Sequence, residues 1–303
     1  MDLSVTILGN NSALPGFGRH PTAQAVSVGN ETFLFDCGEG TQIQMQRFNV
    51  RWKRIRHIFI SHLHGDHYFG LAGLLNSMSL MGRTDAVHLY APATLEIMIQ
   101  QMLDVADAVL SYPLVFHNLI EGEAKTLAES SLFEVSCFPV EHRIQCHGFK
   151  VKTKPRERKI LAEACLANGV PHNFYAKLRT GIDFVNAEGE TIPNSLLTEK
   201  GPEPKMYAYS ADTIFTESYL PYIAGADLLY NESTYLQDNA DKAAARFHCT
   251  SVQAAEIALK AGVKKLLLGH FSSKYRDLKP FEAEARTIFP ESYVSEEGQT
   301  YTI

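Results

Sequence analysis

The sequence predicts an α/β sandwich, with β-sheets inside and helices outside. Short apolar segments alternate with helical patterns in each half of the 303-residue chain. Two such halves in succession are typical of layered α/β domains. Hydrophobic residues make up 45% and charged residues 20% of the chain, which fits a globular domain with a sizeable core.

The first half supplies strands and then helices. Segments rich in Val, Ile, Thr and Phe, bounded by Gly and Asn, predict strands at residues 4–8, 25–28 and 32–36, and a further short apolar run covers residues 57–60. Residues 68–81 and 94–106 have the length and periodicity of helices.

The second half repeats this alternation. Apolar runs predict strands at residues 132–140, 206–210, 227–231 and 265–269. Helical patterns follow at residues 215–223, 251–261 and 281–289.

Between the halves, Thr153–Pro204 breaks the pattern. It contains one predicted helix, residues 159–168, capped by Gly169 and followed by Pro171. The rest is Gly, Pro and polar residues without the periodicity of core elements, which indicates a functional insertion. Although the chain has a net charge of −6, residues 150–181 hold eight Lys and Arg against two Glu. A local basic tract of this kind is typical of a phosphate-binding surface.

The most informative segment is residues 61–67, Ser-His-Leu-His-Gly-Asp-His, which directly follows an apolar strand. Chance gives this H-x-H-x-D-H spacing roughly 0.0007 times in such a chain, so the histidines and the aspartate belong to a motif. Imidazole and carboxylate ligands suit zinc above other divalent ions. One loop that supplies two pairs of ligands predicts two metals a few ångströms apart.

The remaining ligands must come from elsewhere in the chain. His142, Asp212 and His270 each follow an apolar strand. Strand ends are where an α/β sheet gathers its site residues, so we expect these three side chains to complete the metal sites.

The order of these residues is that of a known series. H-x-H-x-D-H followed by a lone His, a lone Asp and a lone His resembles the metallo-β-lactamase superfamily. Over nearly the whole chain the sequence is similar to the ribonuclease Z family in its short bacterial form. The resemblance is carried by Leu8-Gly9 and by residues 35–41 (FDCGEGT), 209–213 (YSADT), 231–234 (NEST), 248–250 (HCT) and 269–275 (GHFSSKY).

The resemblance implies a metallo-β-lactamase αβ/βα sandwich over residues 1–303 and two Zn²⁺ ions per chain. It assigns one zinc to His62, His64 and His142, the other to Asp66, His67 and His270, and the bridge to Asp212. It also makes Asp66, Glu232 and His248 catalytic residues. Asp66 would orient the nucleophile, and His248, oriented by Glu232, would protonate the leaving ribose 3′-oxygen. Asn231 departs from the family, which has a histidine there.

The implied function is a zinc-dependent endoribonuclease that removes 3′ trailers from precursor tRNA, with a 3′-OH left on the tRNA and a 5′-phosphate on the trailer. Thr153–Pro204 would be a protruding flexible arm, a tRNA-binding exosite. Its expected substrate-binding residues are Lys154, Arg156, Arg158, Lys159, Lys177 and Arg179. The family's P-x-K-x-R-N loop appears as residues 15–20, PGFGRH, so sensing of a 3′ CCA end is not carried over.

The family also implies a homodimer, with residues 68–81 and 94–106 as possible dimer surfaces. We expect a cytoplasmic protein without membrane contact, because no signal peptide or spanning segment is recognisable and five scattered cysteines fit free thiols. One alternative is a small-molecule phosphodiesterase or other hydrolase of the same fold, which would need no basic arm. Another is a non-catalytic RNA-binding protein, in which metal ligands are typically lost.

Overall fold

A computed structural model describes residues 3–303. It divides the chain into two compact units. The main unit holds the residues up to Lys152 together with Lys205–Ile303, and the inserted unit is Thr153–Pro204.

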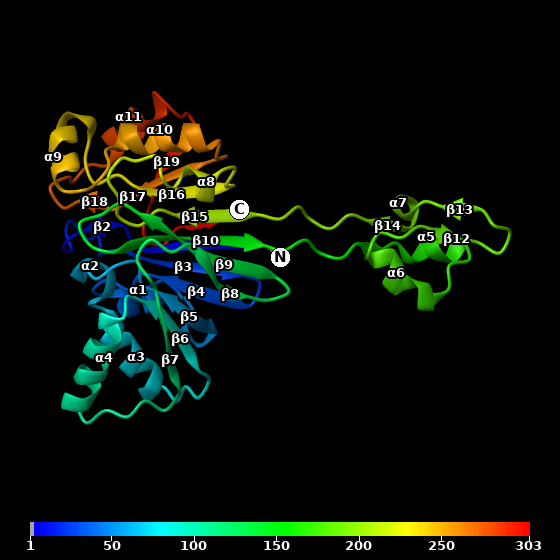
Figure 1. Cartoon of the computed structure of the whole chain (residues 1–303), viewed down its shortest axis with the longest axis horizontal. Coiled ribbons are helices and arrows are strands. Elements are labelled where there is room, and N and C mark those ends of the chain that lie inside the picture. Colours follow the sequence, from blue (N-terminus) through cyan, green and yellow to red (C-terminus); the bar gives the residue numbers. More distant parts are fainter. Residues whose placement is uncertain (1–2) are drawn as a thin grey trace. The chain divides into compact units, whose positions relative to one another are not determined.

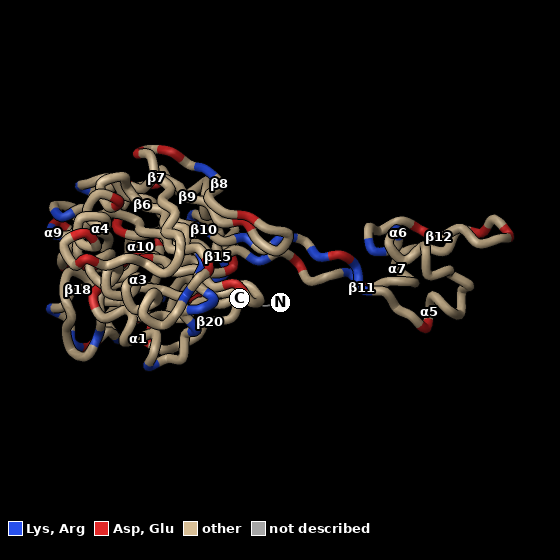
Figure 2. The backbone as a smooth tube through the Cα atoms, turned by 90° about the horizontal axis from the view of Figure 1, so that it is seen from below, with Lys and Arg blue, Asp and Glu red and all other residues tan. Residues whose placement is uncertain are grey.

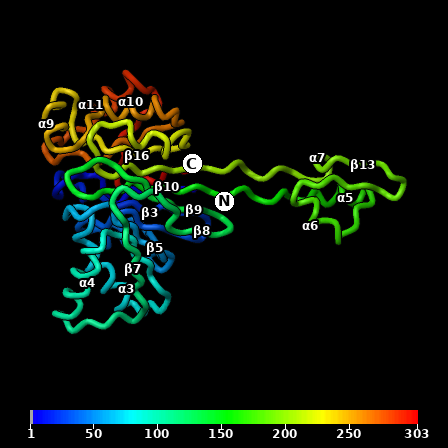
Figure 3. The backbone as a smooth tube through the Cα atoms, in the orientation of Figure 1, coloured from blue at the N-terminus to red at the C-terminus, as the bar shows by residue number. Residues whose placement is uncertain are grey.

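Two seven-stranded sheets form the centre of the main unit. The first has the order β20 (Thr300–Thr302), β1 (Leu3–Gly9), β3 (Ala23–Val28), β4 (Glu31–Phe35), β5 (Ile55–Phe59), β6 (Val87–Ala91) and β7 (Leu114–Asn118). The second has the order β19 (Ser292–Val294), β17 (Leu266–Gly269), β16 (Leu228–Glu232), β15 (Met206–Tyr209), β10 (Cys146–Thr153), β9 (Phe133–Val140) and β8 (Lys125–Glu129). In Figure 3 the labels β3, β5 and β7 mark strands of the first sheet, and β8, β9, β10 and β16 mark strands of the second.

Helices cover the outer faces of both sheets. In Figure 1, α3 (Leu71–Leu80) and α4 (Thr94–Val105) lie on one side of the strands, and α10 (Ser251–Ala261) and α11 (Lys279–Arg286) lie on the opposite side. The shorter helices of the main unit are α1 (Thr41–Arg47), α2 (Gly65–Tyr68), α8 (Leu220–Ile223) and α9 (Ala240–Ala245). The metallo-β-lactamase sandwich expected from the sequence is confirmed.

The first sheet contributes side chains to two hydrophobic cores, one on each of its faces. Phe33 and Phe35 of β4 belong to the core between the sheets, whereas Leu34 between them packs in the core beneath α3 and α4. Phe59 and Ile58 of β5 divide in the same way. Successive side chains of a strand point to opposite faces, so apolar runs such as these predict strands that are buried on both faces.

Most predicted elements lie within a few residues of the observed ones. The helix predicted at 251–261 coincides with α10, which Thr250 and Gln253 begin with a capping box and Gly262 ends in a left-handed conformation, φ 61°. The helix predicted at 68–81 is interrupted at Gly70, whose N–H donates to the Cys37 carbonyl. A Cβ at Gly70 would lie 2.2 Å from the Gly38 carbonyl oxygen, so the close approach of the two segments ends the first helix there.

Two helix predictions were too long. In residues 215–223 only Leu220–Ile223 is helical, because Thr216 instead hydrogen-bonds Glu141 and the backbone N–H of Ser218. In residues 159–168 the helix is α5 (Ala162–Ala167), because Lys159–Ile160 forms strand β11, which pairs with β14 (Thr198–Glu199).

The inserted segment is folded, although its sequence lacks the periodicity of core elements. It has its own apolar cluster of Cys165, Val170, Leu178, Phe184 and Leu197. Its further elements are α6 (Tyr175–Arg179), α7 (Asn194–Leu197) and the hairpin of β12 (Phe184–Val185) and β13 (Thr191–Ile192). Such short elements leave too little periodicity to recognise in a sequence. Across residues 3–303, no helix combines the length and hydropathy needed to cross a membrane.

Substituting Gly148→Ala tests the packing between the sheets. The new Cβ would lie 2.3 Å from ring carbons of Phe138 and 2.8 Å from the Tyr209 carbonyl oxygen. Because both neighbours are buried, we expect a loss of about 1–3 kcal/mol in the free energy of unfolding, measured by urea titration. Gly73→Ala is the control, since its nearest neighbour is the movable end of Gln42 at 3.3 Å; an equal loss there would contradict the account.

Candidate metal centre

The strand ends bring distant parts of the chain to one place. The H-x-H-x-D-H loop follows β5, His142 follows β9, Asp212 follows β15 and His270 follows β17. In parallel sheets the carboxyl ends of neighbouring strands share an edge, and loops that leave that edge meet. As a result, all seven ligands predicted from the sequence lie in two adjoining clusters.

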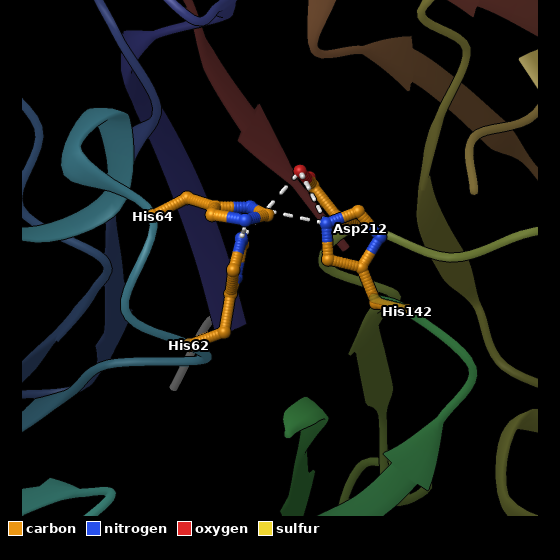
Figure 4. Close-up of side chains that lie close together, drawn as sticks. All are labelled: His62, His64, His142 and Asp212. Carbon is orange, nitrogen blue, oxygen red and sulfur yellow. Dashed lines mark hydrogen bonds and ion pairs between the residues drawn. The ribbon is translucent and has the colours of Figure 1, made fainter. Parts of the chain in front are cut away.

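The first cluster contains His62, His64, His142 and Asp212 (Figure 4). His62 Nε2 lies 3.0 Å from His64 Nδ1, and His142 Nε2 lies 3.1 Å from the same nitrogen. The Oδ2 atom of Asp212 lies 3.7 Å from His62 Nε2 and 3.9 Å from His142 Nε2. Four donor atoms therefore converge on one point.

The second cluster contains Asp66, His67 and His270. The Nε2 atoms of the two histidines are 3.3 Å apart, and Asp66 Oδ2 lies 3.4 Å from His270 Nε2 and 3.6 Å from His67 Nε2. Asp66 Oδ2 also accepts a hydrogen bond of 2.7 Å from the Ala13 backbone N–H.

Asp212 faces both clusters. Its Oδ2 atom belongs to the first, while its Oδ1 atom lies 3.2 Å from His270 Nε2 and 3.5 Å from His67 Nε2. Oδ1 is buried and has no hydrogen-bond partner within residues 3–303. A buried carboxylate oxygen without a partner is costly, so this atom fits a bound cation.

The histidine ligands are held from behind through their second ring nitrogen. His62 Nδ1 lies 3.0 Å from the Ser61 hydroxyl, and His142 Nδ1 donates to the Phe247 carbonyl at 2.9 Å. The contacts of the second cluster are His67 Nδ1 to Asp36 Oδ2 at 2.7 Å and His270 Nδ1 to the Thr234 hydroxyl at 3.0 Å. Contacts of this kind fix the ring orientation and leave Nε2 to bind a metal.

Asp36 supports the metal centre through several buried hydrogen bonds. Its side chain is fully buried and accepts hydrogen bonds from the Ser61 N–H at 2.7 Å, the Ser61 hydroxyl at 2.9 Å and the Tyr209 hydroxyl at 2.5 Å. Asp36 has a positive φ of 56°, a conformation that aspartate tolerates better than most residues.

The electrostatics of the site favour a cation. Burial opposes a charge on His67, but the carboxylates of Asp212, Asp36 and Asp66 outweigh it and hold the pKa of His67 well above its usual range. Burial lowers the pKa of His64 to about 4, helped by His142, and burial lowers that of His62 well below its usual range. The neutral form of His62 and His64 is the one that binds a metal, and a cation beside the three carboxylates would take the place of the proton on His67.

The donor set fits zinc. Four ligands at about 2.0–2.1 Å from a tetrahedral zinc ion lie about 3.3–3.4 Å from one another, close to the observed 3.0–3.9 Å separations. Imidazole nitrogen and carboxylate oxygen are ligands that zinc accepts in catalytic sites.

The predicted proton-handling pair lies beside the clusters. His248 Nδ1 lies 2.8 Å from Glu232 Oε1 and 4.0 Å from Asp212 Oδ2. Burial opposes the charge of His248, but Glu232 outweighs it and raises the pKa of the imidazole to about 9. Glu232 is itself held by the N–H groups of Thr213 and Thr234. Asn231, the departure from the family pattern, accepts a hydrogen bond from the Tyr219 hydroxyl.

The six predicted substrate-binding residues all lie in the inserted unit. Figure 2 shows basic residues along the segment that leads into β11 and at α6. The two regions are joined, since the Arg158 N–H donates to the Arg179 carbonyl. Contacts within the unit include the Arg158 guanidinium donating to Thr198, Lys159 at 3.7 Å from Glu199 and Lys177 over the Phe174 ring.

Several contributors were missed from the sequence. The Ala13 N–H and the Phe247 carbonyl act through the backbone and leave no signal in residue type. Arg143 and Arg246 line the cavity in front of the clusters. Their positions beside His142 and His248 were the signal that could have identified them.

Comparisons with known proteins identify the fold. YhfI of Bacillus subtilis, a metallo-β-lactamase fold protein, matches 100% of both chains with a TM-score of 0.70 at 18% identity. A family model described as anti-Pycsar protein Apyc1 matches residues 3–156. The structure and its clusters therefore define a metal-binding hydrolase of the metallo-β-lactamase fold.

Full-length similarity narrows this class. Ribonuclease Z of Parabacteroides distasonis is 41% identical over 303 residues, which covers 100% of this chain and 99% of that one. The short form of human tRNase Z matches 98% of both chains with a TM-score of 0.72 at 25% identity. The chain belongs to the ribonuclease Z family.

Replacing Asp36 by Asn tests how the site is held. The amide removes the negative charge that His67 Nδ1 contacts at 2.7 Å, so the imidazole becomes a weaker ligand. We expect roughly 10–100-fold weaker metal affinity, measured by titrating the chelated protein with metal. Asp227→Asn is the control, because Asp227 pairs instead with Lys264; similar losses in both variants would contradict the role of Asp36.

Proposed function

We propose that the chain is a two-zinc endoribonuclease that removes 3′ trailers from precursor tRNA. The observation that carries the proposal is a carboxylate, Asp212, shared between two donor clusters beside the Glu232–His248 pair. The site lies in a chain that is similar over its full length to ribonuclease Z relatives. When bound, zinc ions would neutralise phosphate charge and lower the pKa of a water molecule.

The ligands would divide between two ions. His62, His64 and His142 would hold one, Asp66, His67 and His270 the other, and Asp212 both. The two Asp212 oxygens support this assignment, because each faces a different cluster. Asp66 would also orient the attacking nucleophile, since its Oδ2 atom borders the cavity and is fixed by the Ala13 N–H.

His248 would protonate the leaving 3′-oxygen. Glu232 occupies Nδ1, which makes Nε2 the nitrogen that can deliver a proton into the cavity. The products would be a tRNA that ends in a 3′-OH and a trailer with a 5′-phosphate.

The inserted unit would bind tRNA away from the cut, through Lys154, Arg156, Arg158, Lys159, Lys177 and Arg179. Contacts to phosphate and shape suit an enzyme that serves many tRNAs. The tertiary core and the Arg158–Arg179 connection support this role, because they hold basic segments together within one unit.

A second copy of the chain would cover the exposed apolar side chains of α3, α4 and the turn after α4. These are Leu80, Met81, Ile97, Met102, Val105 and Val109. Apolar residues that gather on neighbouring helices are typical of a subunit interface, which supports a homodimer. The five cysteines are free and buried, which supports a cytoplasmic location.

Cleavage of a 3′-extended precursor tRNA tests the function directly. The products should carry a 3′-OH on the tRNA and a 5′-phosphate on the trailer, and chelation should abolish the reaction until zinc is restored. Hydrolysis of bis-p-nitrophenyl phosphate alone, with the precursor left intact, would favour a small-molecule phosphodiesterase.

The role of His248 predicts a dependence on the leaving group. His248→Ala should keep its metal but cleave precursor tRNA roughly 10²–10⁴-fold more slowly, because general-acid catalysis contributes about that factor. The loss should be much smaller for bis-p-nitrophenyl phosphate, whose leaving group needs little protonation. Equal losses on both substrates, with metal content unchanged, would contradict proton transfer by His248.

The inserted unit should affect binding more than chemistry. Replacing Thr153–Pro204 with a short Gly/Ser linker should raise the KM for precursor tRNA and flatten its salt dependence, because remote contacts act alike on ground and transition states. Hydrolysis of a small phosphodiester should survive, since every proposed metal ligand lies in the main unit. A folded, metal-loaded deletion variant with an unchanged KM would contradict the exosite.

A further inference from the structure

The cavity in front of the metal clusters has an unexplained basic rim. It encloses about 710 Å³ and is bordered by Asp66, Asp212, His248 and His270. Arg143 and Arg246 are its only lysine or arginine lining residues among those that the structure describes. Both are exposed, and in residues 3–303 neither guanidinium has a hydrogen-bond or ion-pair partner.

The two arginines are close in sequence to residues of the metal centre. Arg143 directly follows the metal-ligand candidate His142, and Arg246 lies two residues before His248. The two loops are joined where His142 Nδ1 donates to the Phe247 carbonyl at 2.9 Å. Both guanidinium groups therefore belong to the rim formed by the ligand and proton-donor loops.

An aromatic ring also borders the cavity. Phe69 is 64% exposed, although the next helix, α3, begins with the buried Leu71. Gly65 admits the ring, since a Cβ at that position would lie 2.1 Å from a Phe69 ring carbon. A ring held against the ligand loop with much of its surface exposed is suited to stacking on a base.

Together these features match the chemistry of single-stranded nucleic acid. Cationic side chains bind the phosphate backbone, and aromatic rings stack on bases without regard to sequence. A free phosphate would not use the ring, and a neutral ligand would not use two unpaired guanidinium groups.

We propose that the cavity rim binds the RNA strand at the cut. Arg143 and Arg246 bind phosphates next to the scissile phosphate, and Phe69 stacks on an adjacent base. This inference rests on the proposed function and adds positioning residues in the main unit, separate from the inserted unit. It explains how a flexible single strand is aligned with the metal clusters once the body of the tRNA is bound.

Substitution of each arginine tests its contact with phosphate. Arg143→Gln and Arg246→Gln should each lower kcat/KM for a 3′-extended precursor tRNA roughly tenfold, as expected for a lost charged hydrogen bond. Each should also lower the slope of log kcat/KM against log salt by about 0.7. Hydrolysis of bis-p-nitrophenyl phosphate, which has only the scissile phosphate, should fall by a smaller factor than precursor cleavage. Arg56→Gln is the matched control, because Arg56 is exposed but pairs with Asp85 outside the cavity.

Precursors with one neutral methylphosphonate next to the cut then locate each contact. When the methylphosphonate replaces the phosphate that an arginine binds, substituting that arginine should cause no further loss of kcat/KM. Unchanged kcat/KM in both variants, or additive losses with every methylphosphonate, would overturn the inference. So would equal losses on bis-p-nitrophenyl phosphate, which would indicate damage to the metal centre. If the wild-type protein cleaves bis-p-nitrophenyl phosphate but no precursor, the proposed function itself fails.

The stacking contact has its own test. Phe69→Leu should reduce precursor cleavage, Phe69→Trp should restore it, and an abasic nucleotide beside the cut should abolish the difference. Sedimentation velocity should give the same mass for all variants. A smaller mass for Phe69→Leu would place Phe69 in a subunit interface and overturn its role in stacking.

Discussion

The site depends on the placement of one carboxylate. Asp212 is buried, lies three residues after the end of β15, and presents Oδ2 to one histidine cluster and Oδ1 to the other. An uncompensated charge in this position would be costly, and bound cations would offset that cost. The same constraint explains the surrounding hydrogen bonds, because imidazoles that share a carboxylate must be held at fixed angles. Asp36, Ser61 and Thr234 supply that support through the outer ring nitrogens.

The fold gathers the ligands at one edge, and three residues of the site, Asp36, Ala211 and His270, have a positive φ there. Ligands follow strands of two sheets that pack face to face, so the loops at one edge meet whatever their separation in sequence. The apolar interior fixes the strands, and loop residues carry the chemistry. The basic residues lie in two parts of the protein. The inserted unit has its own small core and carries all six basic residues predicted from the sequence to bind substrate, whereas Arg143 and Arg246 lie within the rim of the metal cavity.

The seven proposed ligands lie together in the structure, whereas several predicted elements around them have other bounds. Histidine and aspartate are rare enough that their spacing identifies a metal motif, and strand ends identify where His142, Asp212 and His270 belong. The inserted unit was missed as a folded element because its strands are two residues long and its core depends on distant pairs such as Ile160 with Thr198. The helix expected at 215–223 failed because a tertiary contact, Thr216 with Glu141, outweighs local periodicity. Backbone contributors such as the Ala13 N–H cannot be recognised from residue type.

Metal analysis of the purified protein tests the shared carboxylate most directly. The wild-type chain should contain close to two zinc ions, and Asp212→Ala should lower occupancy of both sites, because each has lost a ligand. Circular dichroism should show that the variant keeps its fold, so that metal loss reports on the site alone. A wild-type stoichiometry of one zinc per chain, unchanged by Asp212→Ala, would contradict the account.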